Sequence, residues 1–478
     1  MRFKDLDSSY IDGQWVRGPS TFAVVNPATG ELLAEVADLT KQQIGLGIDA
    51  AAQAFPLWSS KTSHERAIVL KRWSALINLN NENLAQLMTA EQGKPLAEAR
   101  GEVAFGATFI DWFAEEAKRA YGEVIPTAFA GKRYTTLRQA SGVAAAITPW
   151  NFPVAMLTRK AGAALAAGCT MIAKPAAETP LCALLLARLA DEAGLPAGVF
   201  NVITTTRSAE AGEALCESSK VRVLSFTGST AVGKQLYRQC ADTMKRLALE
   251  LGGNAPLVIF DDADLEKAVA GAMATKYRNA GQTCVCANRI YVQSGIYEAF
   301  AARFCEAVLQ LKVGDGTEDG VLIGPLISTK ALQKVQGLVE DAVQKGATVR
   351  VGGSVHSRGG SFYQPTVLEN VKIGMRILNE EVFGPVAPLI RFETEAQALA
   401  MANDSTVGLA AYVYTRDLSR SIRMSEGLQA GIIGINDTLP SVAVAPFGGV
   451  KDSGLGREGG RQGLDEYMDT KFVCVGII

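Results

Sequence analysis

The run of consecutive apolar residues at 143–148 constrains the fold of this chain most strongly, because it is typical of a strand that is buried on both faces. After it, the patterns of helices and strands alternate. Residues 149–153 lead into a predicted helix that ends at 167, and a strand at 170–173, a helix at 179–193, and strands at 200–203 and 223–226 follow. This alternation predicts an α/β fold with a doubly wound parallel sheet, whose ligand should lie beyond the carboxyl ends of the strands.

A second α/β unit is expected from about 256 to 447. Its candidate strands are 257–260, 290–292, 387–392, 411–414 and 432–436. Upstream of both units, Thr40 can cap a helix, and two longer helical stretches run around 64–91 and 95–120. The C-terminal residues 471–477 have the pattern of a late strand with an apolar edge, and such an edge needs a partner. A length of 478 residues accommodates two or three domains.

Composition excludes several classes of function. The 48% of hydrophobic and 20% of charged residues are typical of a globular protein, and the net charge of −2 gives no reason to expect nucleic acid or an anionic membrane as partner. With no signal-peptide pattern, a soluble cytoplasmic protein with eight free thiols is expected. The two histidines, His64 and His356, fit no metal-binding pattern, so we expect no metal and no histidine base.

Cys284 is the candidate nucleophile. It lies in the connection between a helical pattern that Gly281 interrupts and the strand at 290–292, where a substrate can approach a thiol. A small packed hydrophobic residue is the alternative for a lone cysteine. Without a suitable histidine, its base is expected to be a carboxylate. Glu250 is a candidate because two glycines follow at 252–253 and allow close approach of a ligand, although a glutamate at the end of a helix would look the same.

Two further motifs indicate a nucleotide. Residues 228–233 follow a strand and open a helix, so their backbone N–H groups and the helix dipole could bind a pyrophosphate; a plain tight turn is the alternative. Lys174 follows the second strand of the nucleotide unit, from where a side chain reaches the adenosine ribose, unless it is an ordinary surface lysine.

Seven motifs in order resemble the aldehyde dehydrogenase superfamily over essentially the whole chain. They are Pro149-Trp150-Asn151-Phe152-Pro153, Lys174-Pro175, Phe226-Thr227-Gly228-Ser229, Glu250-Leu251-Gly252-Gly253, Gly281-Gln282-Thr283-Cys284, Glu381-Val382-Phe383-Gly384-Pro385 and Pro446-Phe447-Gly448-Gly449. The resemblance implies a dinucleotide-binding domain (1–123 and 143–255), a catalytic domain (256–447) and an oligomerisation element (124–142 and 448–478). A homodimer or homotetramer is implied.

The resemblance also implies a mechanism. The Cys284 thiolate attacks an aldehyde, the Asn151 amide and the Cys284 N–H stabilise the oxyanion, and the thiohemiacetal yields a thioester by losing hydride to NADP or NAD. Glu250 is the base for the water that hydrolyses the thioester. The implied cofactor-binding residues are Trp150, Lys174, Ala177, Gly228, Ser229, Leu251, Glu381 and Phe383.

Within the superfamily the chain looks most like succinate-semialdehyde dehydrogenases. Those enzymes hold the far carboxylate with two arginines and a serine, which match Arg159, Arg278 and Ser441 here. The planar fork of arginine suits a carboxylate, although ion pairs on a helix surface are the alternative. The segment 437–445 differs from the amino-acid sequence that is usual in these enzymes, which makes Ser441 the least secure match of the three. Glutarate and 2-oxoglutarate semialdehyde remain alternative substrates, because a methylene separates substrates by only about 1–3 kcal/mol.

Cofactor choice and redox behaviour complete the expectations. NAD-preferring relatives commonly have glutamate at the position of Ala177, so NADP should be accepted here, with Glu178 one place further on able to swing into the same space. If residues 284–286 are extended, Cys284 and Cys286 lie about 6.5 Å apart and could form a strained, labile disulfide. Rival readings are a thiol redox protein, a catalytically silent relative and a CoA-acylating enzyme.

Overall fold

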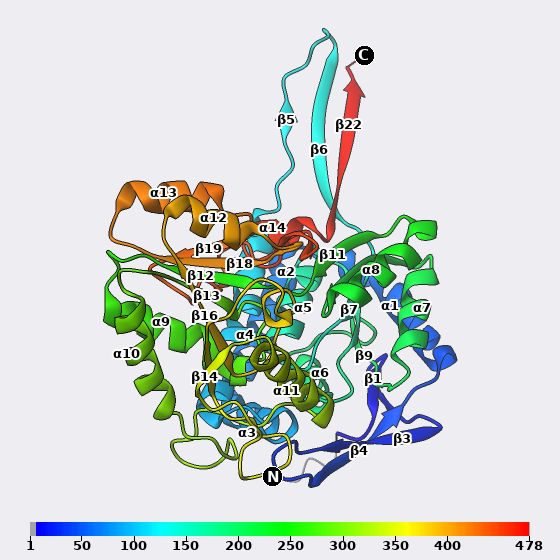
Figure 1. Cartoon of the computed structure of the whole chain (residues 1–478). Helices are drawn as coiled ribbons and strands as arrows, with labels where there is room; N and C mark the ends of the chain where they lie inside the picture. The colour runs from blue at the N-terminus through cyan, green and yellow to red at the C-terminus, as the bar shows by residue number, and fades with distance from the viewer. Residues whose placement is uncertain (1–5, 478) are drawn as a thin grey trace.

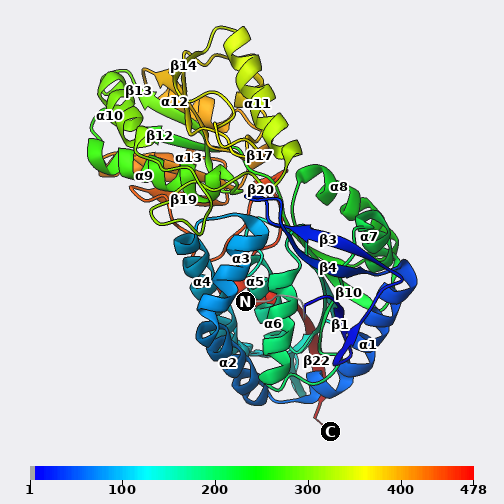
Figure 2. The same ribbon diagram turned by 90° about the horizontal axis from the view of Figure 1, so that it is seen from below.

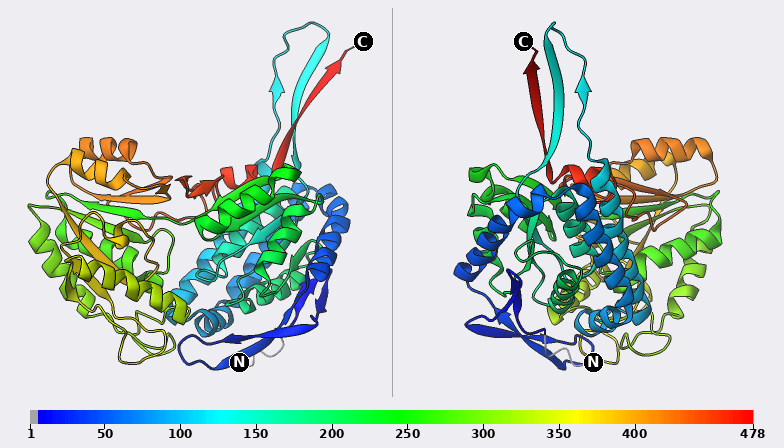
Figure 3. Two further views of the ribbon diagram at one scale, coloured as in Figure 1. Left: turned by 45° about the vertical axis from the view of Figure 1, so that its right-hand side comes forward. Right: turned by 180° about the vertical axis from the view of Figure 1, so that it is seen from behind.

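The computed structural model describes residues 6–477. Two α/β bodies lie side by side, and a narrow arm of strands projects away from them (Figures 1 and 3). Within the described residues, no helix combines the length and the apolarity needed to cross a membrane.

The first body is built on an eight-stranded sheet with the order β2-β1-β9-β8-β7-β10-β11-β21. Its strands are β1 (Ser9–Ile11), β2 (Gln14–Val16), β7 (Val143–Ile147), β8 (Thr170–Lys174), β9 (Phe200–Val202), β10 (Val221–Thr227), β11 (Arg246–Glu250) and β21 (Gly454–Leu455). The five central strands from β9 to β11 are parallel, and the edge strands are antiparallel. The predicted doubly wound sheet is confirmed, with β7 at its centre.

Helices cover both faces of this sheet (Figure 2). One layer contains α1 (Lys41–Ser60), α7 (Ser208–Glu217) and α8 (Thr230–Gln239); the other contains α2 (Ser63–Leu79), α3 (Asn81–Gln92), α4 (Leu96–Glu116), α5 (Ala155–Ala167) and α6 (Leu181–Glu192). Thr40 caps α1 with a complete capping box, as its sequence predicts. The stretch expected to be helical around 64–91 is two helices, because the backbone turns at Asn80.

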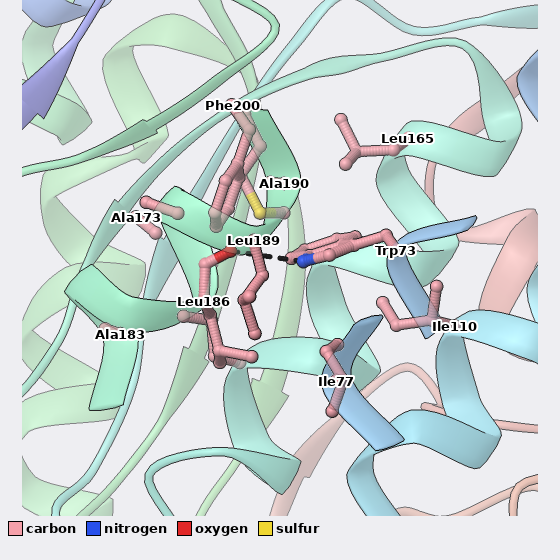
Figure 4. Close-up of a cluster of buried hydrophobic side chains, with 14 of the residues drawn as sticks. Trp73, Ile77, Ile110, Leu165, Ala173, Ala183, Leu186, Leu189, Ala190 and Phe200 are labelled. Atoms are coloured by element: carbon pink, nitrogen blue, oxygen red, sulfur yellow. Dashed lines mark hydrogen bonds between the residues drawn. The ribbon is translucent and has the colours of Figure 1, made fainter. Parts of the chain in front are cut away.

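The core between the sheet and the second layer of helices is closely packed (Figure 4). Trp73 of α2 is fully buried, its ring centroid is 5.3 Å from that of Phe200 on β9, and its indole N–H donates to the Leu186 carbonyl at 3.1 Å. The hydrogen bond satisfies the one polar group that this large side chain takes out of water. α2 is thereby fixed to both α6 and the sheet.

The second body has a seven-stranded sheet with the order β14-β15-β16-β13-β12-β18-β19, parallel except for β14. Its strands are β12 (Ala255–Ile259), β13 (Ala287–Gln293), β14 (Thr348–Val351), β15 (Thr366–Glu369), β16 (Val386–Phe392), β18 (Ala410–Tyr414) and β19 (Ile432–Ile435). Its helices are α9 (Leu265–Tyr277), α10 (Tyr297–Leu309), α11 (Thr329–Gln344), α12 (Glu395–Asn403) and α13 (Leu418–Gly427). All five strands predicted here are present.

The projecting arm consists of β5 (Val124–Ile125), β6 (Lys132–Ala140) and β22 (Met468–Gly476), in which β22 pairs antiparallel with β6 along its whole length. The predicted C-terminal strand therefore has its partner within the chain. Residues just before the arm join the bodies, since β20 (Val450–Lys451) pairs with β17 (Val407–Gly408) and β21 pairs with β11. The remaining elements are the hairpin of β3 (Ser20–Val25) and β4 (Leu32–Asp38), and the short α14 (Gln462–Asp465).

Candidate active site

Cys284 lies in a tight loop between the two bodies' facing edges. Helix α9 ends at Tyr277, and the next turn carries three left-handed residues, Asn279 (φ 51°), Ala280 (φ 54°) and Gly281 (φ 75°). A side chain at Gly281 would place its Cβ 2.2 Å from the Gly384 carbonyl oxygen, so only glycine fits there. The loop therefore holds Cys284 half-buried at the start of β13.

The expectation that residues 284–286 are extended is wrong. The Cys286 N–H donates to the Thr283 carbonyl at 3.0 Å, which closes a turn around Cys284. The Cys286 thiol points toward the Lys276 carbonyl at 3.6 Å, and Cys286 lines neither of the cavities described below. The turn arises because β13 begins at Ala287, and the preceding residues must reverse direction after α9.

Two cavities meet at Cys284. The larger has a volume of about 490 Å³ and lies at the carboxyl ends of the first sheet, against the N-terminus of α8. The smaller has a volume of about 140 Å³ and lies on the other side of the thiol. Cys284 and Met156 line both. A group bound in one cavity can therefore reach the sulfur from the side opposite to a group bound in the other.

Six of the eight predicted cofactor-binding residues line the larger cavity. They are Trp150, Gly228, Ser229, Leu251, Glu381 and Phe383. Lys174 and Ala177 do not line it; the Lys174 ammonium donates to the Pro175 carbonyl at 3.2 Å, whereas Glu178 does line the cavity. The prediction missed Ser328, Lys330 and Lys334 at the start of α11, because nothing in their local pattern marks them.

The larger cavity fits a dinucleotide. The helix N-terminus at Ser229 presents backbone N–H groups and the positive end of the helix dipole, which suit a pyrophosphate. Deeper in, the rings of Trp150 and Phe383 lie 5.5 Å apart, centroid to centroid. The Glu381 carboxylate accepts the Gly253 N–H at 3.3 Å, and burial raises its pKa to about 7. A hydroxyl-bearing ribose near Glu381 would supply the polar partners that this carboxyl lacks.

Glu250 is the last residue of β11, and the alternative of a glutamate at a helix end is wrong. Its side chain lines the larger cavity, is buried, and neither carboxyl oxygen has a hydrogen-bond partner among the described residues. Burial, followed by the nearby charge of Glu458, raises the pKa of Glu250 well above its ordinary value. A Cβ on Gly448 would lie 2.8 Å from this carboxyl, which explains a glycine at that position.

Sequence reasoning missed a buried ion-paired group behind Glu250. The Lys160 ammonium contacts the Glu458 carboxylate and donates to the Ser225 hydroxyl at 2.8 Å, and Arg159 lies 3.6 Å from the same carboxylate. These residues come from α5, β10 and the segment after β21, so only the fold brings them together. The local sequence patterns, an apolar helix and a glycine-rich loop, do not predict this contact.

The Cys284 thiol is protonated at neutral pH in this arrangement. Burial, and secondly the charge of Glu381, raise its pKa to about 12, while the charges of Arg159 and Arg278 act in the opposite direction. The nucleophile therefore needs a proton acceptor before it attacks a carbonyl. Glu250, which lines the same cavity, is the nearest chemical candidate.

Asn151 lies beside the nucleophile's loop. Its side-chain N–H donates to the Gln282 carbonyl at 3.0 Å, and its side-chain oxygen has no hydrogen-bond partner in the described part of the chain. The residue precedes α5 and lines the larger cavity together with Cys284. One N–H of this amide is thus anchored, and the other is available to a ligand.

The smaller cavity is lined by Arg159, Arg278 and Ser441, of which the first and the last are 282 residues apart in the sequence. Arg159 donates to the Ser441 hydroxyl at 3.2 Å, is 1% exposed, and keeps two guanidinium nitrogens without a hydrogen bond among residues 6–477. Its guanidinium stacks on Phe447, 4.2 Å from the ring centroid, and that of Arg278 lies 5.3 Å from the ring centroid of Phe152. The walls of the cavity are largely apolar, and its polar lining includes the two arginines, several hydroxyl groups and Glu102, whose carboxylate is paired with Lys94.

Comparison with known proteins agrees with this geometry. A model of the aldehyde dehydrogenase family matches residues 15–473. Succinate-semialdehyde dehydrogenase (NADP+) of Escherichia coli K12 is 54% identical over 98% of this chain and 97% of its own, and glutarate-semialdehyde dehydrogenase of Pseudomonas putida KT2440 is 53% identical over 100% of both. The crystal structure of succinate-semialdehyde dehydrogenase from Burkholderia pseudomallei superposes with a TM-score of 0.98, at 51% identity over 99% of each chain.

Proposed function

Because this chain belongs to the aldehyde dehydrogenase family, we propose that it oxidises succinate semialdehyde to succinate with NADP or NAD as the acceptor of the hydride. The observation that carries the proposal is the Arg159 guanidinium, which is buried at the wall of the smaller cavity and has two nitrogens without a hydrogen bond among residues 6–477, while Glu458, 3.6 Å away, also pairs with Lys160. A buried cation with open donors is costly unless an anion completes it. A substrate with a terminal carboxylate supplies that anion.

The shape of the smaller cavity supports the same substrate class. Arg278 and Ser441 add a second cation and a hydroxyl on its walls, while Phe105, Phe152 and Phe447 line its apolar part. Methylene groups suit the rings, and a carboxylate suits the paired guanidinium groups, which can each donate two hydrogen bonds. With its carboxylate at the arginines, a four-carbon semialdehyde directs its aldehyde carbon toward Cys284.

The chain's own residues account for the chemistry. A nicotinamide bound in the larger cavity supplies the hydride acceptor. Glu250 accepts the proton of the Cys284 thiol and passes it to solvent, the Cys284 sulfur forms a bond to the aldehyde carbon, and the oxygen that becomes negative is stabilised by the Asn151 amide and the Cys284 N–H. Loss of hydride from this adduct leaves a thioester on Cys284. Glu250 then takes a proton from a water molecule, whose oxygen attacks the thioester and releases the carboxylic acid and the thiol.

Glutarate semialdehyde is a second candidate substrate. A relative at 53% identity carries the name glutarate-semialdehyde dehydrogenase, so a pocket on this scaffold accommodates a chain one methylene longer. One methylene changes binding by only about 1–3 kcal/mol, which predicts overlapping activity. 2-Oxoglutarate semialdehyde has the same terminal carboxylate and is a third candidate.

The proposal extends to assembly and location. Apolar side chains on the arm, including Val124 (84% exposed), Phe129 and Phe472, favour burial against other copies in a homodimer or homotetramer. The three-part division into 1–123 with 143–255, 256–447, and 124–142 with 448–478 assigns this role to the third part. All eight cysteines are free, which fits the reducing cytoplasm.

A kinetic matrix tests the function. Succinate semialdehyde, glutarate semialdehyde and butanal are each combined with NADP and NAD, with Cys284→Ala as the control and product analysis with and without CoA. We expect the acids as products, kcat/KM highest for the carboxylate-bearing aldehydes, and no activity in Cys284→Ala. Butanal turned over as well as succinate semialdehyde would contradict the substrate class. A CoA thioester as product would contradict hydrolysis by way of Glu250.

A further inference from the structure

Two buried amide side chains, Gln92 and Asn279, connect the first body to the loop of Cys284. Gln92 is the last residue of α3, and Asn279 lies five residues before the nucleophile. The Gln92 amide donates to the Asn279 side-chain oxygen at 3.0 Å, and its own oxygen accepts the Lys94 N–H at 3.0 Å. Both side chains are buried, and neither lines the two cavities at Cys284.

The Asn279 amide makes the connection to the oxyanion site. Its N–H groups donate to the Asn151 carbonyl at 3.0 Å and to the Gln282 carbonyl at 3.3 Å. The Gln282 carbonyl is also the acceptor that anchors the Asn151 side-chain amide. One asparagine thus holds both the backbone of Asn151 and the group that sets the direction of its side chain.

Lys94 supports the same point from the other side. Its ammonium donates to the Asn151 carbonyl at 2.8 Å and contacts the Glu102 carboxylate, which accepts the backbone N–H groups of Val154 and Ala155 at the start of α5. The Asn151 carbonyl therefore has two side-chain donors, one reached through Gln92 and one from Lys94. Two independent donors therefore fix the position of the same peptide carbonyl.

The backbone of Asn279 shows that this position is held against a local preference. Asn279 (φ 51°) and Ala280 (φ 54°) are both left-handed, a conformation that is strained for residues other than glycine. Asparagine tolerates it best, and the Glu98 carboxylate accepts its backbone N–H at 2.8 Å. Without its side-chain contacts, the loop could relax, and the Gln282 carbonyl would move away from Asn151.

We propose that Gln92 is a positioning residue of the oxyanion site: by fixing which side of the Asn279 amide donates, it holds the Asn151 amide toward the carbonyl oxygen of the aldehyde that Cys284 attacks. The proposal rests on the function proposed above. Gln92 lines neither cavity, so it acts through its two side-chain contacts, the Asn279 amide and the Lys94 N–H, and only the first of these needs the Gln92 N–H. Its contribution belongs to the first chemical step, in which negative charge develops on the carbonyl oxygen.

Gln92→Glu tests this with nearly the same side-chain volume. The new side chain has no N–H to donate. Either the Asn279 side-chain oxygen then faces a carboxylate oxygen, or the Asn279 amide rotates and presents that oxygen to the carbonyls of Asn151 and Gln282. Gln86→Glu is the matched control, since Gln86 lies on the exposed face of the same helix and bonds only Glu82. Gln92→Met, of similar shape and without any donor, carries the same prediction if the glutamate variant does not fold.

Three quantities are measured on the full-length protein. The rate of the first burst of reduced cofactor should fall about tenfold or more in Gln92→Glu, up to the roughly 100- to 1,000-fold loss for removing an oxyanion donor outright, because the Asn151 amide is displaced and not deleted. The Kd for NADP and the rate of Cys284 alkylation by iodoacetamide, followed by peptide mass spectrometry, should each change less than about twofold, because neither needs an oxyanion. Gln86→Glu should match the wild type in all three.

The outcomes separate this proposal from the function on which it rests. If the wild type reduces no cofactor with any of the semialdehydes, the proposed function fails. If the wild type gives a burst and Gln92→Glu gives the same burst rate, the positioning role fails while the function stands. If the burst rate and the alkylation rate fall and the Kd for NADP rises in both Gln92 variants, Gln92 supports the loop as a whole, which also overturns the proposal.

Discussion

Replacing Arg278 by methionine should make the enzyme lose its preference for a carboxylate tail. Arg278 is the cleaner of the two arginines to change, because it forms no ion pair among the described residues, whereas Arg159 also faces Glu458. Methionine keeps much of the contact with the Phe152 ring and removes the charge. Arg159 and Ser441 stay in place, so the loss corresponds to one charge-assisted contact.

Such a contact contributes about 1.5–3 kcal/mol, which is about a 10- to 150-fold loss in kcat/KM for succinate semialdehyde. The charge of Arg278 also lowers the pKa of the Cys284 thiol, so its removal slows attack on every aldehyde. Butanal, with the same four carbons and no carboxylate, reports that second effect alone. The ratio of the two kcat/KM values therefore isolates the contact with the carboxylate.

The assay measures initial rates of cofactor reduction for both aldehydes in wild type, Arg278→Met and Arg416→Met. Arg416 lies outside both cavities, is exposed, and controls for the loss of one surface charge. We expect the ratio to fall by about tenfold or more only in Arg278→Met. Equal losses for the two aldehydes would show that Arg278 serves the thiol or the loop, and the reasoning about the carboxylate would be refuted.

Three other predictions concern the reaction, the cofactor and redox sensitivity. Glu250→Gln should give a rapid burst of reduced cofactor followed by slow turnover. In the wild type, turnover should rise with pH through the raised pKa of Glu250, because the base must be deprotonated. A flat pH profile would contradict this role. Ala177→Glu should lower the NADP/NAD ratio of kcat/KM, and an unchanged ratio would remove Ala177 from cofactor choice. Peroxide should inactivate the wild type reversibly; a Cys284–Cys286 disulfide then requires the turn to open, because the Cys286 thiol faces the Lys276 carbonyl, and if Cys286→Ala behaves in the same way, sulfenic acid at Cys284 is the better explanation.

Local patterns were sufficient to predict the framework of this protein. The apolar runs at 143–148 and 257–260 are strands at the centres of the two sheets, and Thr40 caps a helix, because burial of consecutive side chains and capping of free N–H groups are properties of neighbouring residues. The seven motifs identified Cys284, Glu250 and Asn151 as candidate site residues, because each motif consists of a few adjacent residues. All three now line one cavity.

Only the tertiary structure decided the contacts between segments that are far apart in the sequence. Gln92 and Asn279 are 187 residues apart, and Lys160 and Glu458 are 298 residues apart, yet each pair is in contact inside the protein. No periodicity in the sequence encodes such a pair, because its formation depends on the docking of whole sheets and helices. The same holds for the turn at Cys284 and for the pKa of Glu250. The turn follows from the reversal of the chain between α9 and β13, and the raised pKa of Glu250 follows from burial and from the charge of Glu458, which a distant segment brings to the site.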